Sequence, residues 1–418
     1  MALPLEGVRV LDLSQVWSGP LAGRILADMG AEVIYIMSRQ RIPLTQVSPE
    51  VATILGWYPN NDPGEDPWNR SSVYNDFARN KLGITLELNT DEGIDVFKRL
   101  VKVSDVVLEN FSPRVMPNFG LDHPDLKKIN AGIIMCRMPG YGLSGPYREF
   151  VSFGTNLDPA SGMASLMGYP GEEVHMSGNA YPDPVAGLHA AAAILTALYH
   201  RRRTGKGQGI DLSQAESATC VIGEAVLGYA VNGKIPRNRG NRHPEYAPQG
   251  CYPCKGEDKW VMIAVTTEAQ WSAFCRAMDI SDLADDPNYS TAGLRVKNQD
   301  ELDKRISTWT LNYAHYEIME RLQKVGVPAG AVLNAAELSA DPHLAERDFF
   351  WEIEHPRAGR HQYCGLPIRF SGTPPCPRRP APLLGQHNRL VLSGILGLSD
   401  EEIDGLEQKG IIGSTPLM

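Results

Sequence analysis

The first third of the chain alternates short apolar runs with amphipathic stretches. Apolar runs lie at residues 7–14, 31–36, 83–88, 104–111 and 133–138. Between them, residues 19–30, 90–103 and 123–132 read as helices. Strands that alternate with helices in this way pair in parallel, because each helix returns the chain to the same edge of the sheet. The pattern predicts an open α/β sheet whose ligand loops lie at the carboxyl ends of its strands.

The loops of this region narrow the ligand classes. The loop after the first apolar run reads SQVWSGPLAG and contains neither GxGxxG nor a P-loop, so the pattern does not predict nicotinamide or ATP binding. Residues 44–76 have no clear period, and such long segments are usually lids or binding loops. Trp57, Tyr58 and Trp68 in this segment suit an apolar pocket, and packing against the core explains them equally well.

The character of the chain changes after residue 225. A polar, Gly- and Pro-rich stretch at 235–250 precedes a strand and helix at 260–278 and a helical region at 300–326. We therefore expect a large α/β domain over 1–225 and a smaller α/β domain over 226–325. Residues 326–418 end in a proline-rich tail with little core of its own, and such a tail usually wraps another domain or another subunit.

Composition excludes several classes of function. The 418 residues carry a net charge of −9, which argues against nucleic acid as the main partner. No run of 18 apolar residues predicts a membrane span, and the N-terminus does not read as a signal peptide. Seven scattered cysteines fit a reduced, cytoplasmic setting. The Cys251–Cys254 pair has no second pair beside it, so we expect no metal site.

Seven segments, in order along the chain, carry a family resemblance. They are LPLEGVRVLDLSQVWSGPLAGRILADMGAEVI from residue 3, ARNKLGITLELNTDEG from 78, SDVVLENFSPRVMPNFGLD from 104, MPGYGLSGPY from 138, RRRTGKGQGIDLSQAES from 201, DDPNYSTAGLRVKNQDEL from 285 and RPAPLLGQHN from 379. Together they resemble the family III CoA-transferases, the group that includes formyl-CoA and carnitine CoA-transferases. Because the segments keep their register over nearly the whole chain, the resemblance is specific.

The resemblance implies an interlocked dimer, in which two chains thread through each other. Each large domain would be Rossmann-like and built from both chain ends, so that residues 326–418 return to complete the large domain that begins at 1–225 and wrap the partner subunit. The partner would be a second copy or a paralogous subunit. Coenzyme A and its thioesters would be substrates, with no tightly bound cofactor. The other substrate would be a carboxylic acid.

The resemblance also assigns Asp183. In this family an Asp just before an Ala-rich helix attacks the donor thioester, and the matching segment here is YPDPVAGLHAAAAILTAL from residue 181. From the residues alone, Pro184 fits the first helical position and Asp183 the N-cap, close to the positive end of the helix dipole. A plain helix cap would look the same, so the helix alone does not distinguish a cap from a nucleophile.

Other positions follow by motif matching. The residues implied to contact CoA are Val16, Trp17, Ser18, Arg39, Arg41, Asn80, Lys81, Asn110, Phe111 and Arg114. Arg114 is included because Asn118 replaces a base that is common in the family motif. The residues suggested for the second substrate are Trp57, Tyr58, Arg79, Arg137, Phe153 and Asn156. The aromatic residues and arginines suit an aryl- or alkyl-substituted succinate, with succinyl-CoA as donor.

Two other functions stay open. The α-methylacyl-CoA racemases share this fold and use a His and an Asp as acid and base, but Phe153 and Gly154 occupy the matching positions here. Some family members pair with a paralogue that has lost its catalytic acid and serves as a structural subunit. Asp183 is present, so this chain reads as an active subunit.

Overall fold

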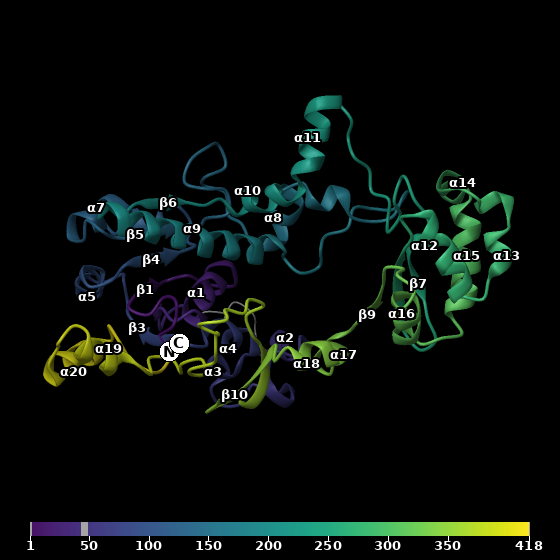
Figure 1. Ribbon diagram of the computed structural model, residues 1–418. Coiled ribbons are helices and arrows are strands. Elements are labelled where there is room, and N and C mark those ends of the chain that lie inside the picture. The colour runs from purple at the N-terminus through teal and green to yellow at the C-terminus, as the bar shows by residue number, and fades with distance from the viewer. Residues whose placement is uncertain (1, 43–48, 418) are drawn as a thin grey trace. The chain divides into compact units, whose positions relative to one another are not determined.

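The computed structural model describes residues 2–42 and 49–417, and the chain forms two compact units (Figure 1). The first unit comprises Met1–Met163, Met176–Asn232 and Ala345–Met418, so both ends of the chain build it. The second comprises Ala164–His175 and Gly233–Leu344. It extends past the expected boundary at residue 325, because strand β9 (Ala329–Val332) pairs with β8 (Trp260–Ala264).

The first unit is built on a six-stranded parallel sheet of order β3-β2-β1-β4-β5-β6, as the alternating pattern predicts. Its strands are β1 (Arg9–Asp12), β2 (Glu32–Met37), β3 (Leu82–Thr85), β4 (Val106–Glu109), β5 (Ile134–Arg137) and β6 (Gly209–Asp211). This is the strand order of a Rossmann fold, in which ligands bind near the carboxyl ends of the strands where the order reverses. Here that position is between β1 and β4.

Both faces of this sheet are buried, which explains its apolar strands. Side chains such as Leu11 and Val107 face one core and Val10 and Val106 the other. The helices of this unit are α1 (Ser18–Asp28), α2 (Pro49–Ile54), α3 (Pro67–Arg70), α4 (Ser72–Ala78), α5 (Asp91–Lys102), α6 (Val115–Asn118), α7 (His123–Ile129), α8 (Gly154–Ala160), α9 (Pro182–Thr204), α10 (Gln214–Thr219), α11 (Gly223–Asn232), α19 (Asn388–Gly394) and α20 (Asp400–Gln408). The segment expected to be a lid or binding loop at 44–76 contains α2, α3 and most of α4 in its described part, and its residues 44–48 lie outside the described residues.

Helices α1 and α9 pack closely on one face of the sheet. A Cβ at Gly187 of α9 would lie 2.6 Å from the carbonyl oxygen of Ser18, so only glycine permits this approach. The close packing brings the first turn of α9 beside the first turn of α1. This contact places Asp183 next to the loop that follows β1.

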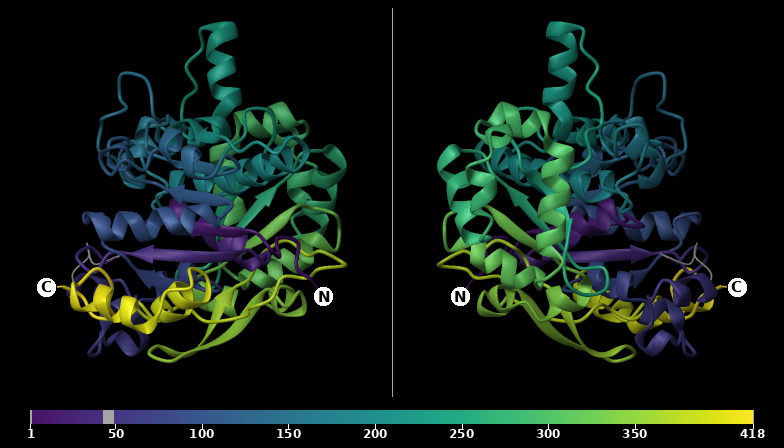
Figure 2. Two further views of the ribbon diagram at one scale, coloured as in Figure 1. Left: turned by 90° about the vertical axis from the view of Figure 1, so that its left-hand side faces the viewer. Right: turned by 90° about the vertical axis from the view of Figure 1, so that its right-hand side faces the viewer.

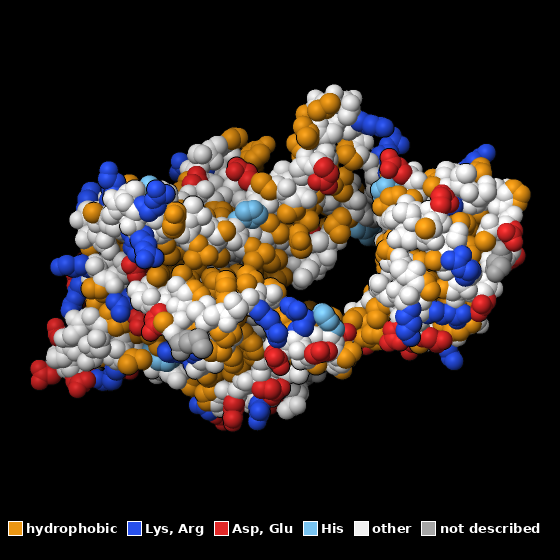
Figure 3. Space-filling model, viewed as in Figure 1, with side chains coloured by type: hydrophobic (Ala, Val, Ile, Leu, Met, Phe, Trp, Pro, Cys, Tyr) orange, Lys and Arg blue, Asp and Glu red, His pale blue; other side chains and the backbone are white. Residues whose placement is uncertain are grey.

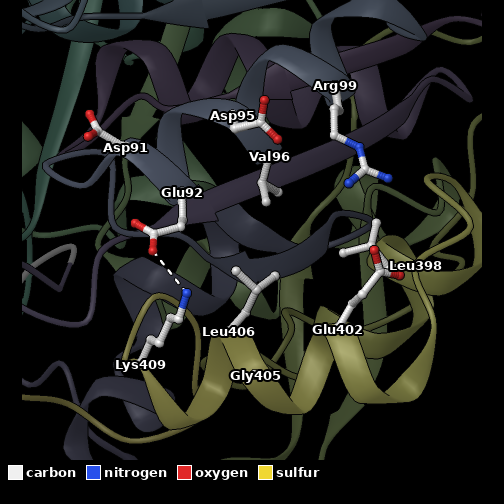
Figure 4. A pocket seen from close by; sticks show the side chains of 10 residues that line it. All are labelled: Asp91, Glu92, Asp95, Val96, Arg99, Leu398, Glu402, Gly405, Leu406 and Lys409. Carbon is white, nitrogen blue, oxygen red and sulfur yellow. Dashed lines mark hydrogen bonds and ion pairs between the residues drawn. The ribbon is translucent and has the colours of Figure 1, made fainter.

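The C-terminal segment returns to the first unit and completes its other core. Val391 of α19 and Ile403 of α20 pack in the same core as α5. Figure 2 shows the helices of this C-terminal segment, in yellow, below the purple N-terminal strand. The strands β10 (Phe350–His355) and β11 (Gly359–Cys364) form an antiparallel hairpin. Between α5 and α20 lies a groove of about 560 Å³, crossed by an ion pair of 3.0 Å between Lys409 and Glu92 (Figure 4).

The second unit contains a three-stranded antiparallel sheet of order β7-β8-β9, with β7 at Gln249–Pro253. Its helices include α12 (Glu268–Ala277), α13 (Ser281–Ala284), α14 (Ala292–Lys297), α15 (Gln299–Thr310), α16 (His315–Gln323) and α17 (Ala335–Ser339), and α18 (Pro342–Glu346) spans its end. The core includes Trp271, Phe274 and Ile306. Within residues 2–42 and 49–417, no helix is long and apolar enough to cross a membrane.

Candidate active site

Asp183 lines a pocket of about 220 Å³ in the first unit. The loops after β1, β4 and β5 supply much of its wall, which is where a parallel sheet is expected to bind a ligand. Its lining residues are Gln15, Val16, Ser18, Arg41, Asn110, Phe111, Ser112, Pro113, Val115, Pro139, Gly140, Phe150, Val151, Ser152, Phe153, Gly154, Asp183 and Gln214. Seven of these were expected from the sequence: Val16, Ser18, Arg41, Asn110, Phe111, Phe153 and Asp183.

The environment of Asp183 differs from a simple helix cap. Helix α9 begins at Pro182 with Tyr181 as N-cap, so Asp183 lies in the first turn and not at the cap. Its side chain is nearly buried, at 7% exposure, and burial raises the pKa of its carboxyl to about 7. Desolvation therefore outweighs the effect of the helix dipole on this carboxyl, because its pKa is raised and not lowered.

Asn110 holds the loop between β1 and α1 in place. Its Oδ1 accepts a hydrogen bond of 2.8 Å from the Gln15 N–H, and its Nδ2 donates to the Gln15 carbonyl at 2.7 Å and to Ser18 Oγ at 3.1 Å. Val16, between them, has a φ of 68°, a left-handed conformation that is strained for a β-branched residue. The three hydrogen bonds of Asn110 thus hold this unusual backbone conformation at the wall of the pocket.

Lys81 lies beneath this loop and does not reach the pocket surface. Its fully buried Nζ donates to Asp12 Oδ2 at 2.8 Å and to the Pro20 carbonyl at 2.9 Å. Burial lowers the pKa of Lys81, while Asp12 opposes that shift. The contact with CoA that the resemblance implies for Lys81 stays a prediction. In this structure, Lys81 ties β1 to the start of α1.

Asn80 and Arg39 are engaged with the C-terminal segment. Asn80 Oδ1 accepts from the Arg378 N–H at 2.7 Å and the Arg379 N–H at 3.1 Å. The Arg39 guanidinium donates to the carbonyls of Thr415 at 2.7 Å and Ile412 at 3.1 Å. Both residues therefore fasten the returning tail in this structure, and neither lines the Asp183 pocket.

Two arginines suggested for the second substrate form ion pairs within the protein instead. Arg79 is fully buried and pairs with Asp28 at 2.8 Å and Asp76 at 2.7 Å. Arg137 pairs with Glu109 at 2.8 Å and with Asp122. Burial raises the pKa of Glu109 to about 7, and Arg137 opposes that shift.

Arg137 also acts on the pocket wall, because it donates to the Pro113 carbonyl at 2.6 Å. In this arrangement it supports the loop after β4. Its guanidinium is engaged by groups of the protein itself and not by a substrate.

The aromatic residues expected at the site do not gather around Asp183. Trp17 stacks on Phe77, with ring centroids 5.9 Å apart. Tyr58 lines a second pocket, of about 420 Å³, with Tyr363. Trp57 is half-buried and lines neither pocket. Of the aromatic residues suggested for the acceptor, only Phe153 is among the described residues that line the Asp183 pocket. Phe150 and Val151 line it as well and add apolar surface.

Asn156 does not line the Asp183 pocket. Its Oδ1 accepts a hydrogen bond of 2.6 Å from the Phe153 N–H and so caps α8. Arg114 is exposed, 3.7 Å from Glu149, and it too lies outside the lining.

The charges of the pocket are sparse. Among its described lining residues, Arg41 is the only cation and Asp183 the only anion, and no histidine is present. A racemase needs a second acid–base group near the substrate, and this lining does not provide one.

Sequence reasoning missed Gln15 and Gln214, although both stand in segments that carry the family resemblance. Gln214 Nε2 donates to the Met138 carbonyl at 2.7 Å. The groove between α5 and α20 contains none of the expected site residues, and its lining carries charges of both signs (Figure 4). Within the described residues, no group of three or more His, Cys, Asp or Glu side chains is arranged to hold a metal ion.

The family model for CoA-transferase family III matches residues 5–388. The chain belongs to CoA-transferase family III. The enzyme is thus a CoA-transferase, and its Asp183 stands in a pocket that is lined in part by the segments that carry the resemblance. A crystal structure of a CAIB/BAIF family protein from Brucella suis has the same fold, with a TM-score of 0.83 and 30% identity, covering 94% of this chain and 100% of that one.

Three relatives of this transferase carry named activities. It is 34% identical to the succinyl-CoA–D-citramalate CoA-transferase of Chloroflexus aurantiacus, and the match covers 98% of both chains. It is 32% identical to the succinate–glutarate CoA-transferase of Agrobacterium fabrum, covering 93% of this chain and 95% of that one. It is also 32% identical to the alpha subunit of the Chloroflexus aurantiacus succinyl-CoA–L-malate CoA-transferase, covering 98% and 93%.

Proposed function

We propose that this transferase moves CoA from succinyl-CoA to a dicarboxylic acid, with Asp183 as the covalent nucleophile. The observation that carries the proposal is that Asp183 is the only acid among the described residues lining a pocket between the β1 and β4 loops. The three named relatives act on dicarboxylic acids or their CoA esters, which supports the substrate class.

The first half of the reaction would load CoA onto the enzyme. The ionised Asp183 attacks the thioester carbonyl of succinyl-CoA, the C–S bond breaks, and a mixed anhydride and CoA thiolate form. The thiolate then attacks the aspartyl carbonyl and releases succinate, leaving an aspartyl-CoA thioester. In the second half, the acceptor carboxylate attacks the aspartyl carbonyl, the C–S bond breaks, and a new mixed anhydride and CoA thiolate form. The thiolate then attacks the acceptor's acyl carbonyl, which gives the new acyl-CoA and releases the Asp183 carboxylate.

The pocket supplies the physical requirements of these steps. Helix α1 begins at Ser18, and a helix N-terminus presents N–H groups that have no partner within the helix. Such donors stabilise a developing oxyanion, by about 3 kcal/mol for a well-placed one. Arg41 would meet a negative group remote from the reacting carboxyl. A second carboxylate on the acceptor fits this role, and substituted succinates stay within the class because Phe153 and Phe150 offer apolar surface.

A second subunit would complete the site. The pocket of about 220 Å³ is smaller than most small-molecule sites and far too small for a whole acyl-CoA. Helix α11 buries none of its residues, and Leu227 and Val231 are 63% and 71% exposed (Figure 3). Apolar side chains gathered on one helix support a covering partner. We propose the interlocked dimer, of two copies or of paralogous subunits.

A transfer assay tests the proposed function. Purified protein is given succinyl-CoA and each of a panel of acids: citramalate, glutarate, malate, benzylsuccinate, acetate and butyrate. The expected product is the CoA ester of one or more dicarboxylic acids, and Asp183→Asn is expected to abolish its formation. A preference for acetate or butyrate would contradict the substrate class, and full activity in Asp183→Asn would contradict the nucleophile.

A further inference from the structure

Gly154, the first residue of helix α8, lies directly against the carboxylate of Asp183. A Cβ built on Gly154 would stand 2.3 Å from Asp183 Oδ2 and 3.0 Å from Asp183 Cγ. Real carbon atoms do not approach oxygen atoms so closely, so any side chain here would displace the carboxylate. Ala180, in the turn before α9, would also be met, at 2.7 Å from its Cβ.

The requirement for glycine at this position is steric and does not come from the backbone conformation. Gly154 is buried and does not have a positive φ, so its backbone would accept alanine without strain. The difficulty is that the alanine side chain would need the space that the Asp183 carboxylate occupies. Helix α8 itself keeps its cap, because the Phe153 N–H bond to Asn156 does not involve residue 154.

We propose that Gly154 is a positioning residue, whose missing side chain allows Asp183 to lie against the start of α8 and face the acyl thioester. The inference rests on the proposed function of Asp183 as nucleophile. A carboxylate held against backbone has one orientation and little contact with water. A side chain at 154 would turn it toward solvent, away from the attack geometry on which the rate depends.

Kinetics of Gly154→Ala test the proposal, since a misplacement of about 1 Å costs on the order of 100-fold in rate. We expect kcat to fall by about that factor, while the KM for succinyl-CoA changes little. The acid limb of the pH–rate profile is expected to move to lower pH, because a displaced carboxylate meets more water. A kcat within threefold of wild type, or a reduced kcat whose acid limb stays in place or moves up, would overturn the proposal.

Two controls separate this effect from general damage. Thr155→Ala changes the exposed next residue of the same helix. Gly405→Ala, in α20, adds a Cβ that meets nothing within 4 Å. Both variants are expected to keep wild-type kcat and the wild-type acid limb.

A double-mutant cycle tests the contact without any activity measurement. The thermal midpoints of wild type, Gly154→Ala, Asp183→Ala and the double variant are compared. Asp183→Ala removes the carboxylate that the new Cβ would strike, while the Ala180 contact is common to both backgrounds. Gly154→Ala is therefore expected to lower the midpoint less when Asp183 is absent.

If Gly154→Ala lowered the thermal midpoint equally with Asp183 present and with Asp183→Ala, or if it prevented folding in both cases, the proposal would be overturned. Because the cycle needs no substrate, it also separates the two claims. If wild type shows no CoA transfer, the proposed function fails while the cycle still reports on the contact.

Discussion

At the scale of the residue, the site depends on a carboxyl group that is costly to ionise. Asp183 has few charged neighbours in its pocket, and burial raises its pKa to about 7. An aspartate of ordinary pKa would be a weaker base and a weaker nucleophile toward a thioester. With a pKa of about 7, a large fraction of the Asp183 carboxyl is ionised at neutral pH, and the ionised form is a stronger nucleophile in the proposed reaction than an ordinary aspartate. The same burial makes Asp183 a source of instability.

The pH dependence of stability follows from this shift. The pKa of Asp183 is higher in the folded state than its unfolded value near 3.8, so folding favours the protonated form. Stability therefore falls as pH rises from about 4 to about 7 and stays low above that. The full shift corresponds to at most ~4 kcal/mol.

Asp183→Asn removes this cost. It is expected to be more stable than wild type at pH 8, by up to ~4 kcal/mol, and no more stable at pH 4. Chemical unfolding at the two pH values measures the difference. Equal stabilities at pH 8 would contradict the raised pKa, and Thr155→Ala serves as the pH-independent control.

The kinetic counterpart is an acid limb in the activity of the free enzyme. If the attacking group is the ionised carboxylate, kcat/KM for succinyl-CoA rises tenfold per pH unit below about pH 7 and levels off above it. Initial rates between pH 5 and 9 give the profile. A limb near pH 4 would show that Asp183 is not desolvated in solution.

The sequence singled out Asp183 as the candidate nucleophile but did not predict its surroundings. Asp183 and the loop residues Val16 and Asn110 were found because they stand in segments with recognisable register. The pairing of Arg79 with Asp28 was not found, since these residues are 51 positions apart and nothing local marks them as partners. The raised pKa of Asp183 likewise depends on burial in the folded pocket, including its contact with Gly154, 29 positions away.

At the scale of the element, the site is a junction between two helix N-termini and three strand ends. Helix α1 brings Ser18, and helix α9 brings Asp183, and the two helices touch at Gly187. The strand order predicted where the loops converge, because parallel strands end at one edge of the sheet. The Ala-rich helix after Asp183 was also expected, but its packing against α1 on the sheet face was not, because α9 comes from a distant part of the chain.

Gly187→Ala tests this junction. The added Cβ would press on the backbone carbonyl of Ser18 at 2.6 Å, and backbone does not yield easily. We expect a loss of about 1–3 kcal/mol in unfolding free energy, as for other overpacked sites. Activity is expected to fall as well, because the two helix ends would separate. Gly405→Ala, which meets nothing within 4 Å, is the matched control and is expected to be neutral or slightly stabilising.

At the scale of the whole molecule, the first unit is an open-sheet α/β domain built from both chain ends. The parallel sheet and its two-sided cores were predictable from apolar runs with helices between them. The dimer stays a prediction that rests on the family resemblance, because the exposed apolar residues on α11 do not identify a partner. Leu227 and Val231 have the exposure of interface residues.

The predicted dimer has a direct test. Native mass spectrometry of the wild type is expected to give about twice the chain mass of 45.9 kDa, or a mixed dimer if a paralogue is supplied. Leu227→Glu is expected to weaken the assembly, since it places a charge where apolar contact is needed. Glu224→Gln, on the same helix, is the control. A monomeric wild type at micromolar concentration would contradict the dimer.

The central claim is that CoA becomes covalently attached to Asp183. The most direct measurement is peptide mass spectrometry after the enzyme has been incubated with succinyl-CoA and then treated with hydroxylamine. The account predicts a hydroxamate on Asp183 alone, formed only when succinyl-CoA is present and absent from Asp183→Asn. An unmodified Asp183 in an enzyme that transfers CoA, or a modification on another residue, would contradict it.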